Sequence, residues 1–181
     1  MRRGFKTDAE QLAERVRREM GLRVADPLRA IDLAEHLGLE VRCADELVSA
    51  DTLRSLDGLQ PGAFSACTFS FPSRRVIVYN PLNSAARTQS DVAHEVSHVL
   101  LDHETKEIHQ IGSITFFTCD PDEEQEANWL AGCVLLPRRL LLTVAKRGWD
   151  AQRVALEYQV SEQMAAFRMR ATGVLRQLRA S

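Results

Sequence analysis

An HExxH motif, His94-Glu95-Val96-Ser97-His98, restricts the fold and chemistry of this 181-residue sequence more than any other feature. In a helix, residues i and i+4 lie on the same face, so both imidazoles can reach one metal ion. Glu95 lies roughly 100° further round the helix, where its carboxylate can reach a water molecule at the metal without binding the metal itself. Two histidine ligands, an open coordination position and a carboxylate base are the arrangement of zinc peptidases.

The residues around the motif favour this interpretation over two helix histidines that only form hydrogen bonds. The segment Asp91–His103 is predicted to be helical, because Val92, Val96 and Val99 fall at helical spacing on an apolar side. Asn83 or Ser84 is expected to cap the start of this helix.

A catalytic zinc ion needs a third protein ligand. A third histidine shortly after the motif is excluded, because Leu101 and Glu104 occupy the glycine and histidine positions that this solution requires. His103 lies five residues after His98, nearly on another face of the helix. We therefore interpret His103 as a structural residue or one that supports the site from outside the ligand set, and His109 as a loop histidine.

A second, acidic helix offers a glutamate instead. Asp120 is a favourable N-cap and Pro121 fits the first helical position. The helix is expected to end near Leu136, before Pro137. Most carboxylates in its first turn should be solvated and stabilised by the helix dipole.

Glu126 is the predicted third ligand among these carboxylates. It lies deeper in the helix than Glu123 or Glu124 and shares a face with Leu130 and Val134. It should therefore point toward the side where the HExxH helix packs. Burial of a carboxylate is costly unless a cation compensates, as a metal ion would.

The two motifs together resemble the ImmA/IrrE family of bacterial and phage metallopeptidases. These are HEVSHVLLDH and, 28 residues after His98, EANWLAGCVLLP at Glu126–Pro137. The resemblance also covers the two N-terminal helices, the VIVYN strand before the first motif, and the tail VALEYQVSEQMAAFRMRATGV. The sequence departs from many relatives at Ser90 and Asp91, where an apolar or aromatic residue is common; this bears on local packing rather than on the chemistry.

The resemblance implies that His94, His98 and Glu126 bind Zn2+ and that Glu95 is the base. It also implies a zinc-dependent endopeptidase that cleaves a helix-turn-helix transcriptional repressor and so derepresses a stress, prophage or defence operon. Such a protease should be inactive at rest, and single-stranded DNA is an activator consistent with the family.

The expected fold is α+β: a zincin-like core with a small antiparallel sheet, the HExxH helix and the glutamate-bearing helix, plus a helical C-terminal tail. We expect a peptidase domain over residues 1–137 and a helical extension packed on it over 138–181. The predicted strands are 39–43, 63–71 and 75–79, the last two forming a hairpin, with a further strand at 113–117. The predicted helices outside the site are 8–20, 27–37, 138–146, 150–158 and 161–178.

Strand 75–79 precedes the motif helix, and we expect it to be an edge strand to which the substrate adds as an extra strand. Tyr79 at its end is a candidate for stabilising the oxyanion. A packed or surface tyrosine is the alternative interpretation.

Cys119 precedes the acidic helix, and its loop can fold over the metal. A thiolate is a strong zinc ligand, so Cys119 is a candidate inhibitory fourth ligand; the alternative is a free loop cysteine. If Cys119 inhibits, Cys119→Ser should raise basal activity, and unchanged or lost activity with intact zinc would contradict the idea.

The bulk properties fit a cytoplasmic protein with reduced thiols. The formal net charge is −2 and the pI about 6.2, so no global basic field favours nucleic acid. The N-terminus has no signal-peptide apolar region and no apolar run reaches membrane-spanning length. The basic residues of the tail can form a nucleic-acid patch or simply be solvated.

Two other functions are open alternatives. A DNA-binding module is suggested by Val154–Arg170, which has the pattern of a helix-turn-helix. A non-catalytic, metal-stabilised regulatory protein is the other, although a structural metal has no use for Glu95.

Overall fold

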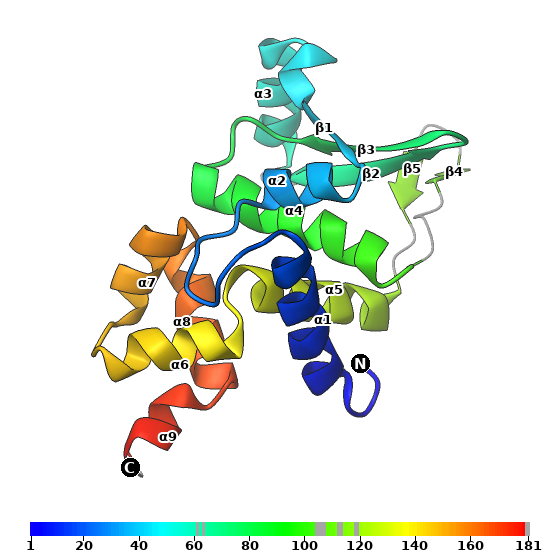
Figure 1. Cartoon of the computed structure of the whole chain (residues 1–181). Coiled ribbons are helices and arrows are strands. Elements are labelled where there is room, and N and C mark those ends of the chain that lie inside the picture. Colours follow the sequence, from blue (N-terminus) through cyan, green and yellow to red (C-terminus); the bar gives the residue numbers. More distant parts are fainter. Residues whose placement is uncertain (61, 63, 104–107, 112–113, 118–119, 180–181) are drawn as a thin grey trace.

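A three-stranded sheet and the helices around it make up the fold (Figure 1). The computed structural model describes residues 1–60, 62, 64–103, 108–111, 114–117 and 120–179. The helices are α1 (Phe5–Glu19), α2 (Ala30–His36), the 3-10 turn η1 (Ala44–Glu46), α3 (Ala50–Leu59), α4 (Ala85–Leu100), α5 (Pro121–Leu135), α6 (Arg138–Lys146), α7 (Ala151–Tyr158), α8 (Glu162–Ala171) and α9 (Val174–Arg179). The strands are β1 (Glu40–Cys43), β2 (Ala66–Phe71), β3 (Arg74–Tyr79), β4 (Ile108–Ile111) and β5 (Ile114–Phe117).

The sheet has the order β1-β3-β2 and is mixed. β2 and β3 form the predicted antiparallel hairpin, in which Phe71 pairs with Arg74 across a two-residue turn and Thr68 pairs with Ile77. β1 runs parallel to β3, because the chain crosses over through η1, α3 and β2 before β3 begins. The α+β class is confirmed. The expectation of a wholly antiparallel sheet with β3 at its edge is wrong, because β3 is the central strand.

Alternation along β3 divides the sheet into two packed faces. Ile77 is fully buried in the main core, on the face that α2 and α4 cover. Its neighbours Val76 and Val78 point the other way and pack with Ala44 and Leu53 of the η1 and α3 region. This alternation is expected of a strand that is buried on both sides, and it fixes which side chains of β2 face α4.

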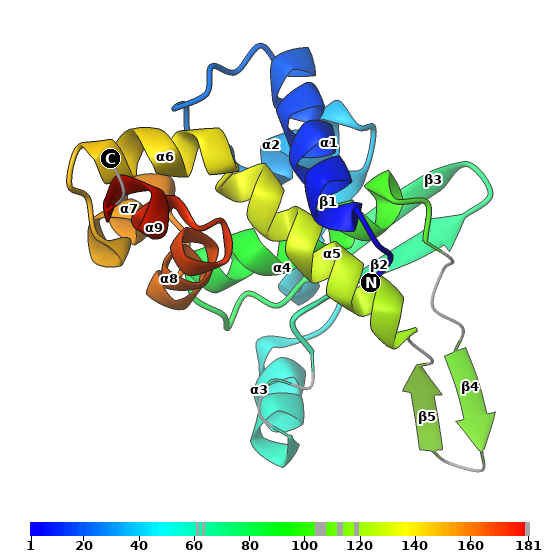
Figure 2. The ribbon, with the colours of Figure 1, turned by 90° about the horizontal axis from the view of Figure 1, so that it is seen from below.

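Helix α5 lies between α4 and α1 and contacts both (Figure 2). Apolar side chains therefore surround most of its length, from Ala127 to Leu135. A helix that is buried on two sides shows little amphipathic periodicity, so the sequence pattern indicates its presence better than its orientation.

The tail shares the main core. Leu140, Val154 and Met169 belong to the same buried cluster as Phe5 and Leu130. The last predicted helix is two helices, α8 and α9, separated at Gly173, whose φ of 71° is left-handed and cannot continue a helix. The predicted boundary at residues 137 and 138 stays a prediction, and the core is continuous across it.

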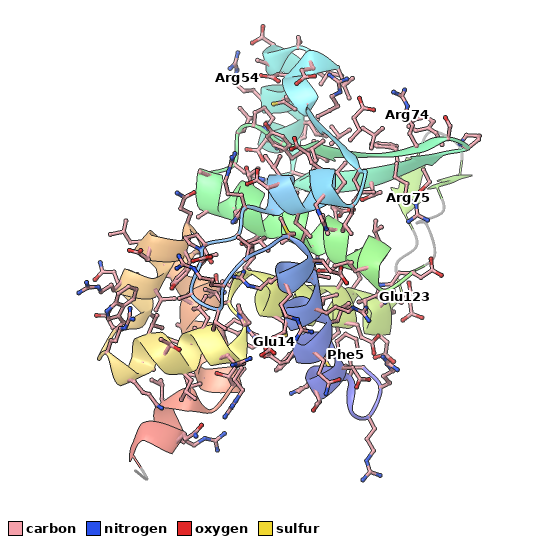
Figure 3. The ribbon with its side chains drawn as sticks, in the orientation of Figure 1. Phe5, Glu14, Arg54, Arg74, Arg75 and Glu123 are labelled. Atoms are coloured by element: carbon pink, nitrogen blue, oxygen red, sulfur yellow. The ribbon has the colours of Figure 1, made fainter. Side chains whose placement is uncertain are left out.

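Charged side chains lie mainly on the outside, as Arg54 of α3 and Arg74 of β3 do (Figure 3). Between α4 and α5, β4 and β5 pair as an antiparallel hairpin, so the strand expected at 113–117 has a partner that was not predicted. His109 lies within β4 rather than in a loop. In the described part of the chain, every helix is too short or too polar to cross a bilayer.

Candidate metal centre

Helix α4 carries the HExxH motif and is capped by Ser84, one of the two predicted caps. The Ser84 hydroxyl accepts a hydrogen bond from the Arg87 N–H. The polar residues that depart from the family pattern are also paired: Ser90 Oγ donates to the Ala86 carbonyl, and Asp91 pairs with Arg87 at 3.0 Å. Burial nevertheless raises the pKa of Asp91.

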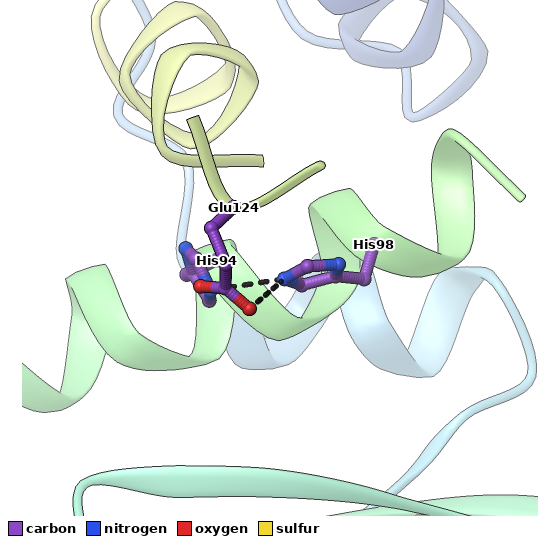
Figure 4. A group of neighbouring side chains, drawn as sticks. All are labelled: His94, His98 and Glu124. Carbon is purple, nitrogen blue, oxygen red and sulfur yellow. Dashed lines mark hydrogen bonds and ion pairs between the residues drawn. The ribbon is translucent and has the colours of Figure 1, made fainter. Parts of the chain in front are cut away.

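Three donor groups from α4 and α5 converge at the motif (Figure 4). His94 Nε2 and His98 Nε2 are 3.0 Å apart. Glu124 places one carboxylate oxygen 3.2 Å from His94 Nε2 and the other 3.4 Å from His98 Nε2. All three side chains are partly buried, and the group is the one cluster of metal-binding type found among the described residues.

The spacing of these donors fits a first-row divalent metal. Zinc ligands lie 2.0–2.2 Å from the ion, so two donors of a tetrahedral site are separated by about 3.3 Å. The separation of the two histidine nitrogens and the separation of each from its nearest Glu124 oxygen, 3.0, 3.2 and 3.4 Å, are close to this value. His94 Nδ1 is buried without a hydrogen-bond partner among the described atoms. Two imidazoles and one carboxylate that converge from two helices therefore match the donor set of a catalytic zinc site.

Glu126, the predicted third ligand, is not part of this donor group. Its Oε2 lies 3.9 Å from His103 Nε2, and its Oε1 accepts a hydrogen bond from the Arg2 N–H. The structure thus brings together the two predicted histidines and a different glutamate, Glu124, from the same acidic helix.

The reason is that α5 has two buried faces rather than one. Glu126, Leu130 and Val134 share a face, as expected, but Glu126 contacts the N-terminal segment and the end of α4. Glu124 shares a face with Ala127 and Ala131, at spacings of three and seven residues. These two alanines are buried, so the Glu124 face of α5 packs against neighbouring elements, as the Glu126 face does.

Glu95 lies beside the donors and is 4% exposed. Thr68 Oγ1 of β2 donates a 2.7 Å hydrogen bond to Glu95 Oε2, which fixes one oxygen of the carboxylate. Sequence reasoning did not identify Thr68. The two-residue hairpin turn would have revealed it, because that turn places Thr68 opposite the buried Ile77, on the face toward α4.

The two remaining candidates gain no support from the described contacts. Tyr79 interacts with Cys43, and burial raises its pKa; no described contact places it at the donors or at Glu95. Cys119 lies outside the described residues. Burial raises the pKa of the Cys133 thiol to about 12, so that this thiol is inert.

The fold and the donor group are those of an HExxH metallopeptidase, with a glutamate from a second helix beside the two histidines. A family model described as peptidase M78, IrrE N-terminal-like domain, matches residues 34–170. The chain therefore belongs to the ImmA/IrrE family of metallopeptidases. No curated protein matches the chain.

Proposed function

We propose that the protein is a zinc-dependent endopeptidase in which His94, His98 and Glu124 bind the metal and Glu95 is the general base. The observation that carries the proposal is the convergence of the three donors beside a buried glutamate that is not one of them. A set of two histidines and one carboxylate favours zinc over harder cations, which prefer oxygen ligands.

A bound zinc ion supplies Lewis acidity, which lowers the pKa of water and polarises the scissile carbonyl. Glu95 accepts the proton of the attacking water and passes it to the leaving amine. Thr68 holds Glu95 Oε2, so that the carboxylate is oriented before the substrate arrives. The buried position of Glu95 limits its access to bulk solvent.

The substrate is proposed to bind to β2 as an additional strand. The expected substrate strand, β3, is paired on both sides, whereas β2 pairs with β3 alone among the described strands. β2 also carries Thr68, so its outer edge passes close to Glu95. An extended peptide that pairs with this edge gains main-chain hydrogen bonds at the catalytic group.

Family membership supports a helix-turn-helix repressor as the protein substrate. The tail contributes exposed basic side chains that single-stranded DNA, as an activator, can contact; among them are Arg139, Lys146, Arg147, Arg153 and Arg170. Arg168 of the same tail is buried against Glu10 and is not available.

A DNA-binding module remains the second candidate function. The helices α7 and α8 pack against each other across a turn at Gln159, whose φ of 53° is left-handed. However, α8 buries Ala165, Arg168 and Met169 against the core, so most of one face is occupied by packing. This favours a structural role for the helix pair.

The metal content of two matched variants tests the ligand set. Glu124→Gln is expected to weaken zinc binding by more than about 100-fold, because a ligand is lost, whereas Glu126→Gln should retain one zinc ion per chain at saturation. Elemental analysis and a chelator competition measure this. Loss of zinc in Glu126→Gln with intact binding in Glu124→Gln would restore the assignment made from the sequence.

A further inference from the structure

Helix α4 ends in a turn that brings His103 back over His98. The Asp102 N–H donates to the Val99 carbonyl at 3.2 Å, and the His103 N–H donates to the His98 carbonyl at 3.0 Å. The backbone of Asp102 is left-handed, with φ of 53°. These are the two hydrogen bonds and the conformation of a Schellman motif, so the position of His103 is set by the backbone.

The two imidazoles contact each other directly. His103 Nδ1 and His98 Nδ1 are 3.0 Å apart, and the His103 side chain is 7% exposed. His98 uses its other nitrogen, Nε2, to face His94 and Glu124. When that Nε2 lone pair binds a metal, the His98 proton is on Nδ1, which donates to His103 Nδ1. The proton of neutral His103 then lies on Nε2.

His103 Nε2 faces a carboxylate. Glu126 Oε2 is 3.9 Å away, a distance of electrostatic attraction rather than of a direct hydrogen bond. The Arg2 N–H donates to Glu126 Oε1 at 3.0 Å and holds the carboxylate in place. The Glu126 side chain is 14% exposed. The N–H groups of His98 and His103 thus point away from the metal centre, toward His103 and Glu126 respectively.

We propose that His103 and Glu126 are positioning residues for the metal ligand His98 and that neither binds the metal. His103 accepts the His98 proton and so fixes the ring orientation and tautomer that leave Nε2 for the metal. Glu126 favours the complementary tautomer of His103. Partners of this kind typically change metal affinity by 10–100-fold. The inference rests on the proposed metal site, and it gives a role to the glutamate that lies next to the centre but outside the donor group.

The test is zinc affinity of the full chain, measured by competition with a chromophoric chelator, together with the visible absorption of the Co2+-loaded protein. His103→Leu should weaken zinc binding by about 10–100-fold, keep one ion per chain at saturation, and alter the Co2+ spectrum. His103→Asn should restore affinity to within a few-fold, because the asparagine Oδ1 occupies the position of Nδ1 and accepts the same proton. His36→Leu, at an exposed histidine of α2, is the control and should change neither quantity.

Glu126→Gln separates positioning from a general structural role. In the wild-type background it should weaken zinc binding less than about 10-fold. In the His103→Asn background it should cause no additional loss of zinc affinity, because asparagine has no Nε2 on which Glu126 can act. Circular dichroism establishes that each variant is folded. If His103→Leu unfolds, the comparison of Glu126→Gln in the wild-type and His103→Asn backgrounds still tests the inference.

Unchanged zinc affinity in folded His103→Leu would overturn the inference while leaving the proposed function intact. So would an effect of Glu126→Gln that persists in His103→Asn. A wild-type protein that binds no zinc would overturn both this inference and the proposed function.

Discussion

Replacing Glu95 with glutamine is expected to leave the metal content unchanged and to lower peptide hydrolysis by about 10²–10⁴-fold, the usual contribution of a positioned general base. Glutamine keeps the size of the side chain and can still accept a hydrogen bond from Thr68, but it cannot accept a proton from water. The measurement is cleavage of the proposed substrate, a helix-turn-helix repressor encoded near the gene, followed by mass spectrometry of the products, with the zinc content determined on the same samples.

The matched control is Glu123→Gln. Glu123 lies in the first turn of α5, one residue before Glu124, and belongs neither to the donor group nor to the contacts described for Glu95. It should keep both zinc and activity. Full activity in Glu95→Gln would exclude Glu95 as the base. Loss of zinc in Glu95→Gln would instead indicate that this carboxylate takes part in metal binding.

Replacing Arg168 with leucine is expected to destabilise the folded protein by about 2–4 kcal/mol, because it removes a fully buried arginine from a partly buried ion pair and leaves Glu10 and the Leu136 carbonyl without their donor. Arg168 is 1% exposed; its Nη2 lies 2.6 Å from Glu10 Oε1 and donates to the Leu136 carbonyl at 3.0 Å. One side chain of α8 therefore joins α1 and the end of α5. Urea unfolding monitored by circular dichroism, in the presence of a chelator, measures the change.

The control uses a second ion pair between the tail and α1. Arg139 of α6 lies 3.6 Å from Glu14, one helical turn after Glu10, but its side chain is 66% exposed (Figure 3 labels Glu14). Arg139→Leu should change the free energy of unfolding by no more than about 1 kcal/mol. Equal effects of the two substitutions would show that burial does not determine the strength of the Arg168 contact.

The motif helix could be predicted closely because its signals are local. The spacing of His94 and His98, the cap before Ala85 and the apolar positions all depend on residues within one helix. The same holds for α5, where Asp120 accepts hydrogen bonds from the N–H groups of Asp122 and Glu123 as its sequence suggests. Helix existence and the identity of the two histidines are therefore readable from the sequence alone.

The sequence predicts Glu126 as the third donor, whereas the structure places Glu124 in the donor group, because the choice depends on which face of α5 meets α4. Both the Glu124 face and the Glu126 face of this helix carry buried residues, so burial does not distinguish them. The choice is made by packing between helices that are distant in the sequence. The same limit applies to β3, whose central place depends on the parallel pairing with β1.

The chain between α4 and α5 has a defined helix end on each side. The turn at Asp102 closes α4, and the Asp120 cap opens α5. The separations among the donors are therefore set by how these helices pack, and a doubling of the length of a connecting loop costs only about 0.6 kcal/mol. The distance between the two ends of the connection is thus fixed by the packing of α4 against α5 rather than by the length of the chain that joins them.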